Sequence, residues 1–158
     1  MPLHQAAQAG DAFAVWALLD GGADAGARDK DGFTPLHGAA VNGQADVVRA
    51  LLEHRADAGA RNEDGATPLH FAAVWGNVNT VRALLSGGAD IEARDRSGDT
   101  PLHWAAVLGN ADTVRALLDG GADVEVRDKK YGHTPLHLAA CKGQADVVRL
   151  LRDARAKE

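Results

Sequence analysis

The sequence predicts an all-α solenoid in which similar helix–turn–helix units stack side by side. The first observation is a tetrapeptide, Thr-Pro-Leu-His, that occurs four times, beginning at Thr34, Thr67, Thr100 and Thr134. Its copies are spaced by 33, 33 and 34 residues, and Pro2-Leu3-His4 is a fifth, shortened copy. The second observation is that apolar residues follow each copy at helical spacing, and the third is that glycines end each helical stretch. Self-similarity at a fixed period of about 20–50 residues is typical of stacked repeat folds.

The spacing divides the chain into five units within one domain, residues 1–158. We expect the units to span residues 1–33, 34–66, 67–99, 100–133 and 134–158. The fourth unit is one residue longer because its loop reads Arg127-Asp128-Lys129-Lys130-Tyr131-Gly132, whereas the preceding loop reads Arg94-Asp95-Arg96-Ser97-Gly98. A single unit cannot bury its own apolar face, so the units must stack to form a core.

The first helix of each unit has a start and a stop in the sequence. Thr34 is a suitable N-cap, and Pro35 is a suitable first helical residue because its missing N–H would be unpaired there. Leu36, Ala39 and Ala40 then share one helical face. A glycine follows each first helix and can adopt the left-handed conformation that ends it, at Gly10, Gly43, Gly76, Gly109 and Gly143.

The second helix carries an apolar stripe that includes Val47 or Val48, Leu51 and Leu52 in the second unit. Gly-Ala-Asp closes this helix at Gly22, Gly88 and Gly121, but Arg55 occupies the equivalent place in the second unit. We expect Arg55 to adopt the left-handed conformation, which costs a non-glycine residue about 1–2 kcal/mol. An Asp/Asn-x-x-Gly turn, typical of a tight hairpin-like loop, then leads to the next threonine.

These motifs resemble the ankyrin repeat. The pattern D-x-x-G-x-T-P-L-H-x-A-A-x-x-G, followed by V-x-x-L-L-x-x-G-A-D, recurs almost intact in the third and fourth units. The resemblance covers essentially the whole chain. It implies an elongated, curved stack whose first helices and hairpin tips line a concave face and whose second helices line a convex face. It also implies recognition of another protein, without catalysis.

Composition narrows the possible partners and the location. The chain has 158 residues, a formal charge of -5 and 46% apolar residues, which is typical of a folded, soluble protein. Residues 1–126 hold 9 basic and 18 acidic residues, whereas residues 127–158 hold 8 and 4. An acidic body argues against nucleic acid, and no apolar run reaches the roughly 18 residues of a membrane span. We therefore expect a protein that binds neither nucleic acid nor a membrane. The lone Cys141, and the lack of a basic segment ahead of an apolar stretch at the N-terminus, lead us to expect a cytoplasmic location.

The residues that could carry chemistry have simpler structural interpretations. The motif histidines, which are His4, His37, His70, His103 and His137, lie a full repeat apart, too far to share one metal ion. The resemblance implies that each bonds its threonine and the neighbouring loop. His137 and Cys141 could share a helix face, but we expect His137 to be engaged already, and no third catalytic residue is evident. We predict no catalytic, cofactor-binding or metal-binding residue.

A basic residue recurs before the Asp/Asn of each loop, at Arg28, Arg61, Arg94 and Arg127. This arginine row could recognise acidic groups of a partner. We favour a structural role, in which each guanidinium bonds acidic or carbonyl groups of adjacent loops.

Partner-binding residues are sought at positions that the repeat does not dictate. Two such positions per first helix are four residues apart and share a helical face. In the third and fourth units they hold Phe71, Trp75, Trp104 and Leu108, which could bind a partner or pack between units. The candidate partner-binding residues are Phe33, Asn42, Asp64, Phe71, Trp75, Arg96, Asp99, Trp104, Leu108, Tyr131, His133 and Lys142. An aromatic centre with a charged rim is typical of binding hot spots.

Phe13 and Trp16 stand at outward positions of the first unit's second helix, where other units have charged or polar residues. They could cover the end of the stack, which we favour, or mediate self-association of a protein that we otherwise expect to be a monomer.

Two other functions stay open: an engineered or fragment scaffold with no partner of its own, and a small-ligand or enzymatic domain.

Overall fold

The computed structural model describes residues 2–75 and 77–157. Ten helices form within those ranges, in five consecutive pairs. They are α1 (Leu3–Ala9) and α2 (Ala12–Asp20), α3 (Pro35–Val41) and α4 (Ala45–Glu53), α5 (Pro68–Trp75) and α6 (Val78–Ser86), α7 (Pro101–Leu108) and α8 (Ala111–Asp119), and α9 (Pro135–Cys141) and α10 (Ala145–Ala156). No strand occurs in these ranges, so the all-α prediction is confirmed.

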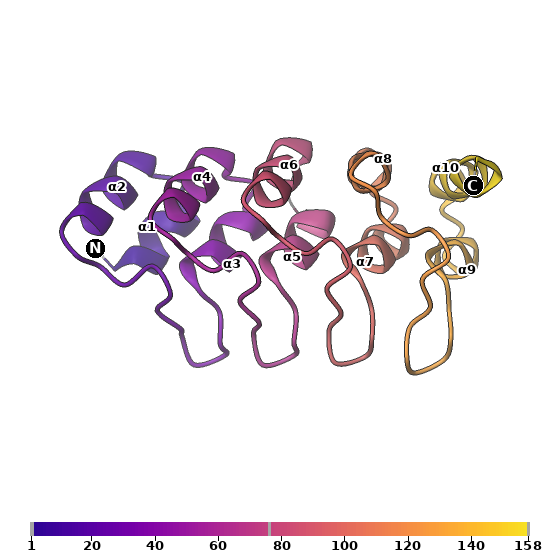
Figure 1. Ribbon diagram of the computed structural model, residues 1–158, viewed down its shortest axis with the longest axis horizontal. Helices are drawn as coiled ribbons and strands as arrows, with labels where there is room; N and C mark the ends of the chain where they lie inside the picture. Colours follow the sequence, from indigo (N-terminus) through magenta and orange to yellow (C-terminus); the bar gives the residue numbers. More distant parts are fainter. Residues whose placement is uncertain (1, 76, 158) are drawn as a thin grey trace.

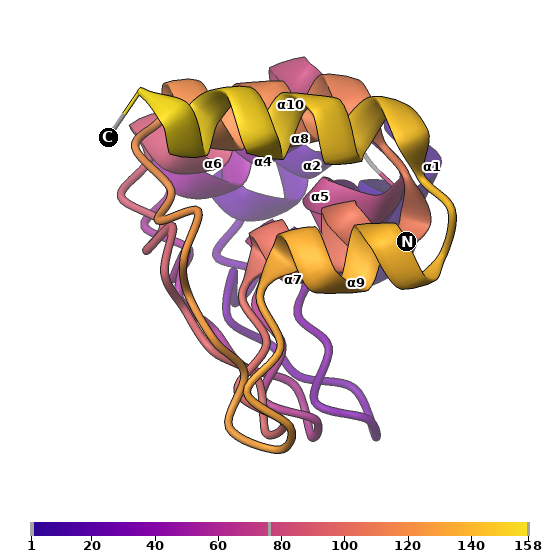
Figure 2. The same ribbon diagram turned by 90° about the vertical axis from the view of Figure 1, so that its right-hand side faces the viewer.

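The helices form two rows, and the loops form a third layer. In Figure 1 the odd-numbered helices lie side by side beneath the even-numbered helices, and four loops project from the odd-numbered row. The end view in Figure 2 shows α10 lying over α9, with the loops extending away from both rows. Each odd-numbered helix packs on its odd-numbered neighbours, and each even-numbered helix on its even-numbered neighbours. The result is the stacked solenoid that the repeat spacing predicts.

Small residues allow the odd-numbered helices to approach one another closely. Pairs of fully buried alanines lie between these helices, at residues 39–40, 72–73 and 105–106. Behind them the core is filled by leucines such as Leu36, Leu69 and Leu102, each with 0% exposure. Leu51, Leu84 and Leu117 of the even-numbered helices are equally buried and close the core from the other side.

The helix ends follow the sequence signals. Thr34 and Thr100 cap α3 and α7, since their side chains accept hydrogen bonds from the N–H groups of His37 and His103. The expected left-handed glycines follow the first helices, with φ of 73° at Gly10, 65° at Gly43, 74° at Gly109 and 70° at Gly143. The fifth expected stop, Gly76, lies outside the described residues.

The second helices end in the conformation expected from Gly-Ala-Asp. The φ angles of Gly22, Gly88 and Gly121 are 95°, 95° and 96°. Arg55 also has a positive φ, 66°, and it is the one non-glycine residue with this property in the described part of the chain. The prediction for Arg55 is therefore confirmed.

Each loop is a hairpin built around its Asp or Asn. The Oδ1 atom of Asp29 accepts hydrogen bonds from the N–H groups of Asp31 and Phe33, each at 2.9 Å. Equivalent bonds form at Asn62, Asp95 and Asp128. Neighbouring hairpin tips are joined by backbone hydrogen bonds, from Glu63 to Asp31, Arg96 to Asp64 and Lys129 to Ser97. The four loops therefore form a continuous surface.

The arginine row ties the hairpins together. The guanidinium of Arg94 donates to the carbonyl oxygen of Gly98 in its own loop at 3.2 Å and to that of Arg127 in the next loop at 2.6 Å. Arg28 and Arg61 donate to the equivalent carbonyls. The structural interpretation of the arginine row is confirmed.

Candidate partner-binding face

The odd-numbered helices and the hairpins present one face of the molecule, which we call the inner face. At its centre lie Phe71 and Trp75 of α5 and Trp104 and Leu108 of α7, which we call the aromatic strip. Trp75 is 61% exposed and Leu108 is 52% exposed. Phe71 and Trp104 are half-buried. The outer two residues are therefore available to a partner, whereas the inner two also pack between units.

The inner residues of the strip pack against one another and against the motif histidines. The ring of Phe71 lies 5.2 Å from that of Phe33 and 5.3 Å from that of Trp104, between centroids. The indole Nε1–H of Trp104 donates to Asp95 Oδ2 at 3.0 Å. Edge-to-face rings at such distances stabilise each other. The strip is consequently continuous across α5 and α7, and its inner half also contributes to packing between helix pairs.

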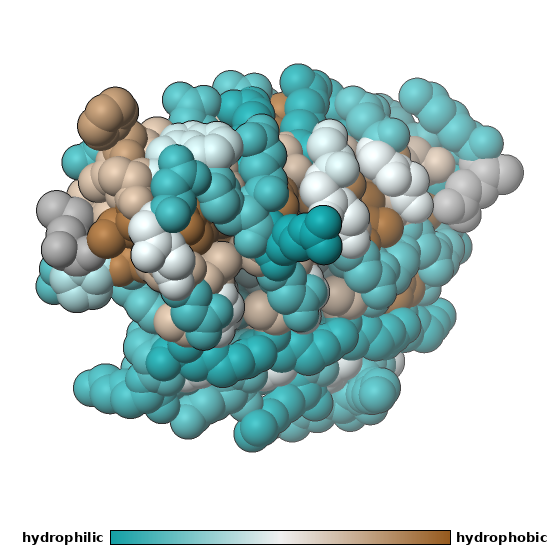
Figure 3. Space-filling view, turned by 60° about the vertical axis from the view of Figure 1, so that its left-hand side comes forward, coloured by the Kyte–Doolittle hydropathy of each residue, from teal (hydrophilic) through white to brown (hydrophobic). Residues whose placement is uncertain are grey.

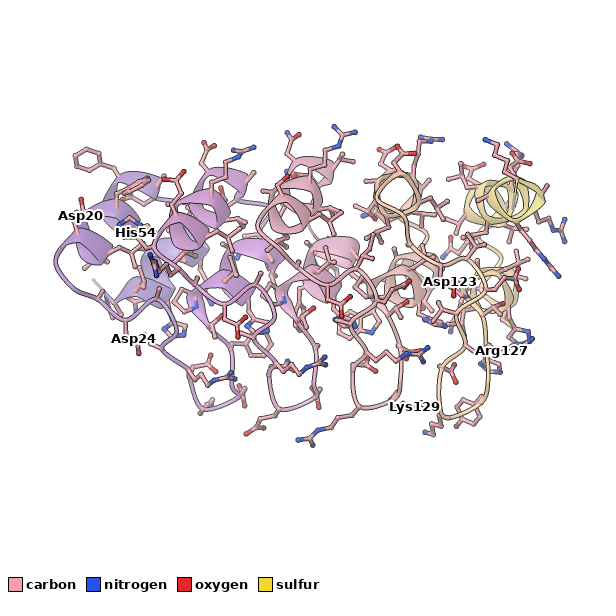
Figure 4. The ribbon with its side chains drawn as sticks, viewed as in Figure 1. Asp20, Asp24, His54, Asp123, Arg127 and Lys129 are labelled. Atoms are coloured by element: carbon pink, nitrogen blue, oxygen red, sulfur yellow. The ribbon has the colours of Figure 1, made fainter. Side chains whose placement is uncertain are left out.

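The remaining predicted binding residues are arranged around this strip. The exposed ones are Asn42, Asp64, Arg96, Tyr131 and Lys142, and the half-buried ones are Phe33, Asp99 and His133. Arg96 and Asp64 are brought together by the backbone bond between their hairpins, at 3.0 Å. Figure 4 shows Arg127 and Lys129 on the last hairpin, with Lys129 at its tip. The face therefore combines an apolar centre with charged hairpin tips.

Three motif histidines are buried and fully bonded. His37 Nδ1 accepts a hydrogen bond from the N–H of Thr34 at 3.1 Å, and its Nε2 donates to the carbonyl of Ala66 at 3.0 Å. His70 and His103 make the same pair of bonds, to the carbonyls of Asp99 and His133. Burial lowers the pKa of all three histidines. Each neutral ring therefore links a helix start to the next hairpin, as the resemblance implied.

His137 departs from this pattern, and the expectation that it is engaged is wrong. Its side chain is exposed, and its ring stacks on that of His133 with centroids 4.3 Å apart. Within the described residues no hairpin follows α9 that could supply a carbonyl acceptor. Cys141, on the same helix, is exposed as well.

Asp99 lies in an acidic setting that the sequence pattern did not reveal. The equivalent position holds Phe33, Ala66 and His133 in the other loops. The Oδ1 atom of Asp99 is buried and has no hydrogen-bond partner among the described residues. Burial, together with the nearby carboxylates of Asp95 and Asp128, raises the pKa of Asp99 to about 6.

Asp99, His103 and Asp128 bring possible metal-ligand atoms within 4.8 Å of one another. Both ring nitrogens of His103 are already bonded, however, to Thr100 and His133. The Oδ1 atom of Asp128 accepts from the N–H groups of Tyr131 and Gly132 at 2.7 and 2.9 Å. A metal bound by His103 would have to displace its bond to Thr100 or to His133, so we assign no metal to this group.

A hollow of about 390 Å³, which the sequence pattern did not predict, lies beside Gly38. The free position on the first helices holds Gln5, Gly38, Phe71, Trp104 and Leu138 in successive units, so α3 lacks a side chain there. We call this hollow the Gly38 notch; its walls include Gln8, Asp29, Asp31, Phe33, Phe71 and Trp75. The one glycine in the series was a signal that could have revealed it.

Phe13 and Trp16 lie at the N-terminal end of the stack, on α2. Phe13 is 86% exposed, so the favoured interpretation, that it covers the end of the stack, is wrong for this residue. Trp16 packs edge-on against His54 at 4.6 Å. His54 Nε2 in turn lies 3.1 Å from Asp20, beside it in Figure 4, and bonds to Ala50 and Asp20 raise the pKa of His54.

The comparison with known proteins agrees with this architecture. A family model described as ankyrin repeats (3 copies) matches residues 3–95 and 88–157. The chain belongs to the ankyrin-repeat family. No curated protein matches it. Among the residues described, no helix is both long and apolar enough to cross a membrane.

Ankyrin repeats generally serve as protein–protein interaction modules, and the family is typically non-catalytic. In this ankyrin-repeat chain the bonded histidines, the capping threonines and the arginine row belong to the shared framework. The aromatic strip, the Gly38 notch and the hairpin tips are what distinguish its surface.

Proposed function

We propose that this chain recognises a partner protein through its inner face and performs no catalysis. The observation that carries the proposal is the aromatic strip, since Trp75 and Leu108 are large, apolar and well exposed at positions that the stack leaves free. Exposed aromatic anchors surrounded by polar residues are typical of binding hot spots. Asp64 and Arg96 of the hairpin tips, together with Lys142 at the C-terminal end of α9, would form the charged rim.

The half-buried residues of the strip support the same role indirectly. Phe71 and Trp104 pack against Phe33 and His70, which holds the neighbouring exposed side chains on a rigid base. A rigid surface loses little conformational entropy on binding. Phe71, Trp104, Asp99 and His133 are therefore expected to shape the face, whereas Trp75, Leu108 and Tyr131 would make most of the new contact.

The test is capture of a partner from a lysate of the source cells with matched variants. The double variant Trp75→Ala/Leu108→Ala removes exposed side chains only, so it should fold like the wild type and lose the partner. The control is Asn79→Ala, which changes an exposed residue of α6, outside the inner face. Equal capture by the wild type and the double variant would contradict the proposal, and capture by none of the three would favour a scaffold without a partner. Fractionation of the same cells would test the expected cytoplasmic location.

A further inference from the structure

Gly38 leaves the notch open, although glycine lowers the stability of α3. Gly38 lies inside α3, and its φ is not among the positive values, so the backbone does not require glycine there. Glycine inside a helix is less favourable than alanine. A Cβ atom at this position would stand 3.0 Å from Cγ of Gln8, which is an exposed and movable side chain. The glycine therefore keeps the notch open where Phe71 and Trp104 fill the equivalent positions.

Aromatic rings form one wall of the notch, whereas polar side chains, including His4, Gln8 and Asn42, line much of the rest. The rings of Phe33 and Phe71 lie 5.2 Å apart, and the exposed indole of Trp75 borders the same hollow. Its volume of about 390 Å³ is within the range of concave sites that bury an organic group. A leucine or an aromatic side chain is the chemical group that the aromatic wall favours.

One side of the notch is acidic. Asp29 and Asp31 line it, and no lysine or arginine does among the residues that the structure describes. Bonds from the N–H groups of Phe33 and Asp31 outweigh the effect of burial and hold the pKa of Asp29 below its usual value, so it is ionised at neutral pH. The next hairpin tip adds Glu63 and Asp64, because the N–H of Glu63 donates to the carbonyl of Asp31 at 3.1 Å. Lys30 and Arg28 offset two of these four negative charges, and the guanidinium of Arg28 is fixed by bonds to backbone carbonyls, so the local balance stays negative.

From this combination we infer that the Gly38 notch binds an extended segment of the partner protein that carries a bulky apolar side chain close to a lysine or arginine. The apolar side chain enters the notch between Phe33, Phe71 and Trp75. The cation, about two residues away on the same side of the extended segment and so about 7 Å along it, faces Asp29 and Asp31. This inference rests on the proposed function, because it assigns the partner chemistry of part of the inner face.

The test uses a library of random twelve-residue peptides displayed on phage, selected on the folded wild-type protein. A selected peptide is then synthesised with a fluorophore, and its affinity is measured by anisotropy. Gly38→Leu fills the notch, and Asp29→Asn/Asp31→Asn removes the charge while keeping the Oδ1 acceptor that Asn62 supplies in the next hairpin. The control, Asn79→Leu, places the same side chain on α6. Circular dichroism checks that each variant is folded.

We expect selected peptides to contain leucine, phenylalanine or tryptophan within three residues of a lysine or arginine. Gly38→Leu should weaken binding at least about tenfold, as for loss of a hot-spot contact. The Asp29→Asn/Asp31→Asn variant should weaken it by about three- to tenfold and reduce its salt dependence. The control should bind like the wild type.

The inference is overturned if no peptide is enriched, if enriched peptides lack this pattern, or if both notch variants bind with unchanged affinity. Peptides that match a stretch of this chain would point instead to a second copy as the occupant and would also overturn it. The proposed function fails separately, if partner capture does not depend on Trp75 and Leu108. A partner that needs those two residues but tolerates Gly38→Leu would leave the proposed function standing and the notch inference refuted.

Discussion

Arg55 is held in a backbone conformation that glycine adopts at the equivalent place in three other helix pairs. Its φ is 66°, and replacing it with glycine removes the steric cost that an L-residue incurs there. We expect Arg55→Gly to raise the free energy of unfolding by about 1 kcal/mol, measured by chemical denaturation. The matched control is Arg82→Gly in the middle of α6, which should lower it by about 1 kcal/mol. Equal or lower stability of Arg55→Gly would contradict the strain argument.

Asp99 should make the protein less stable as the pH rises. Its pKa in the folded state is raised to about 6, from 3.8, chiefly by burial. A carboxyl group with a raised pKa stabilises the fold below pH 4 relative to higher pH, and this contribution is lost as the pH rises through 6. Two pKa units correspond to nearly 3 kcal/mol, which solvent screening of a partly exposed group reduces to about 1 kcal/mol.

Asp99→Asn removes this ionisation, and its amide can donate a hydrogen bond to a neighbouring carboxylate. We expect the variant to melt at a higher temperature than the wild type at pH 7 and at nearly the same temperature at pH 4. Melting curves at both pH values measure the difference. A difference that is constant with pH would show that Asp99 is not the titrating group.

Single residues show what the sequence pattern could and could not predict. The conformation of Arg55 and the bonds of His37 follow from the repeat, because the same backbone geometry and the same histidine bond recur in several units. The half-burial of Phe71 and Trp104 and the raised pKa of Asp99 depend on which side chains occupy neighbouring units at the same position. Such contacts are between units, so the one-unit pattern does not contain them.

At the level of secondary-structure elements, the motif histidines couple each first helix to the following hairpin. His103 is fully buried and bonds to the carbonyl of His133, whereas His137 is exposed. His103→Ala should therefore cost about 2–4 kcal/mol, from lost hydrogen bonds and a cavity. His137→Ala should change the stability by no more than about 0.5 kcal/mol.

Urea denaturation of the two histidine variants measures this contrast, and each serves as the control for the other. Similar losses in both would mean that the histidine acts within its own helix turn rather than through the next hairpin.

The helices themselves were predictable because capping threonines, prolines and glycines are local signals. For the Gly38 notch the sequence offers only one signal, the glycine at the free position of α3, since a missing side chain becomes a hollow only through the residues that surround it.

At the scale of the whole molecule, packing runs without a break from α1 to α10 among the described residues. We propose on this basis that residues 1–158 form one domain with the five units expected from the sequence. In such a stack each unit contacts only its neighbours, so stability is approximately a sum over units and interfaces. Among the described helices, the first pair, α1 and α2, and the last pair, α9 and α10, each pack against one neighbouring pair.

The N-terminal end should make the protein associate weakly with itself. Figure 3, in which this end comes forward, shows hydrophobic residues gathered on the helices above a hydrophilic layer of loops. Phe13 is 86% exposed there, beside Trp16 at 39%. We expect light scattering to show a rise in mass with concentration that Phe13→Asp abolishes, because exposed apolar patches favour association. The control is Asn79→Asp, at the equivalent position of α6, which should associate as the wild type does. A wild-type protein that stays monomeric at high concentration would contradict the expected association.

Hydrogen exchange of the complex shows whether the partner binds the inner face, because amides that a partner covers exchange more slowly. The captured partner is added to the purified protein, and exchange of backbone amides is compared with that of the free protein. We expect slower exchange in α5, α7 and the hairpin tips around Asp64 and Arg96, with exchange in α4, α6 and α8 unchanged. Slower exchange confined to the even-numbered helices, with the hairpins and α5 unaffected, would contradict it.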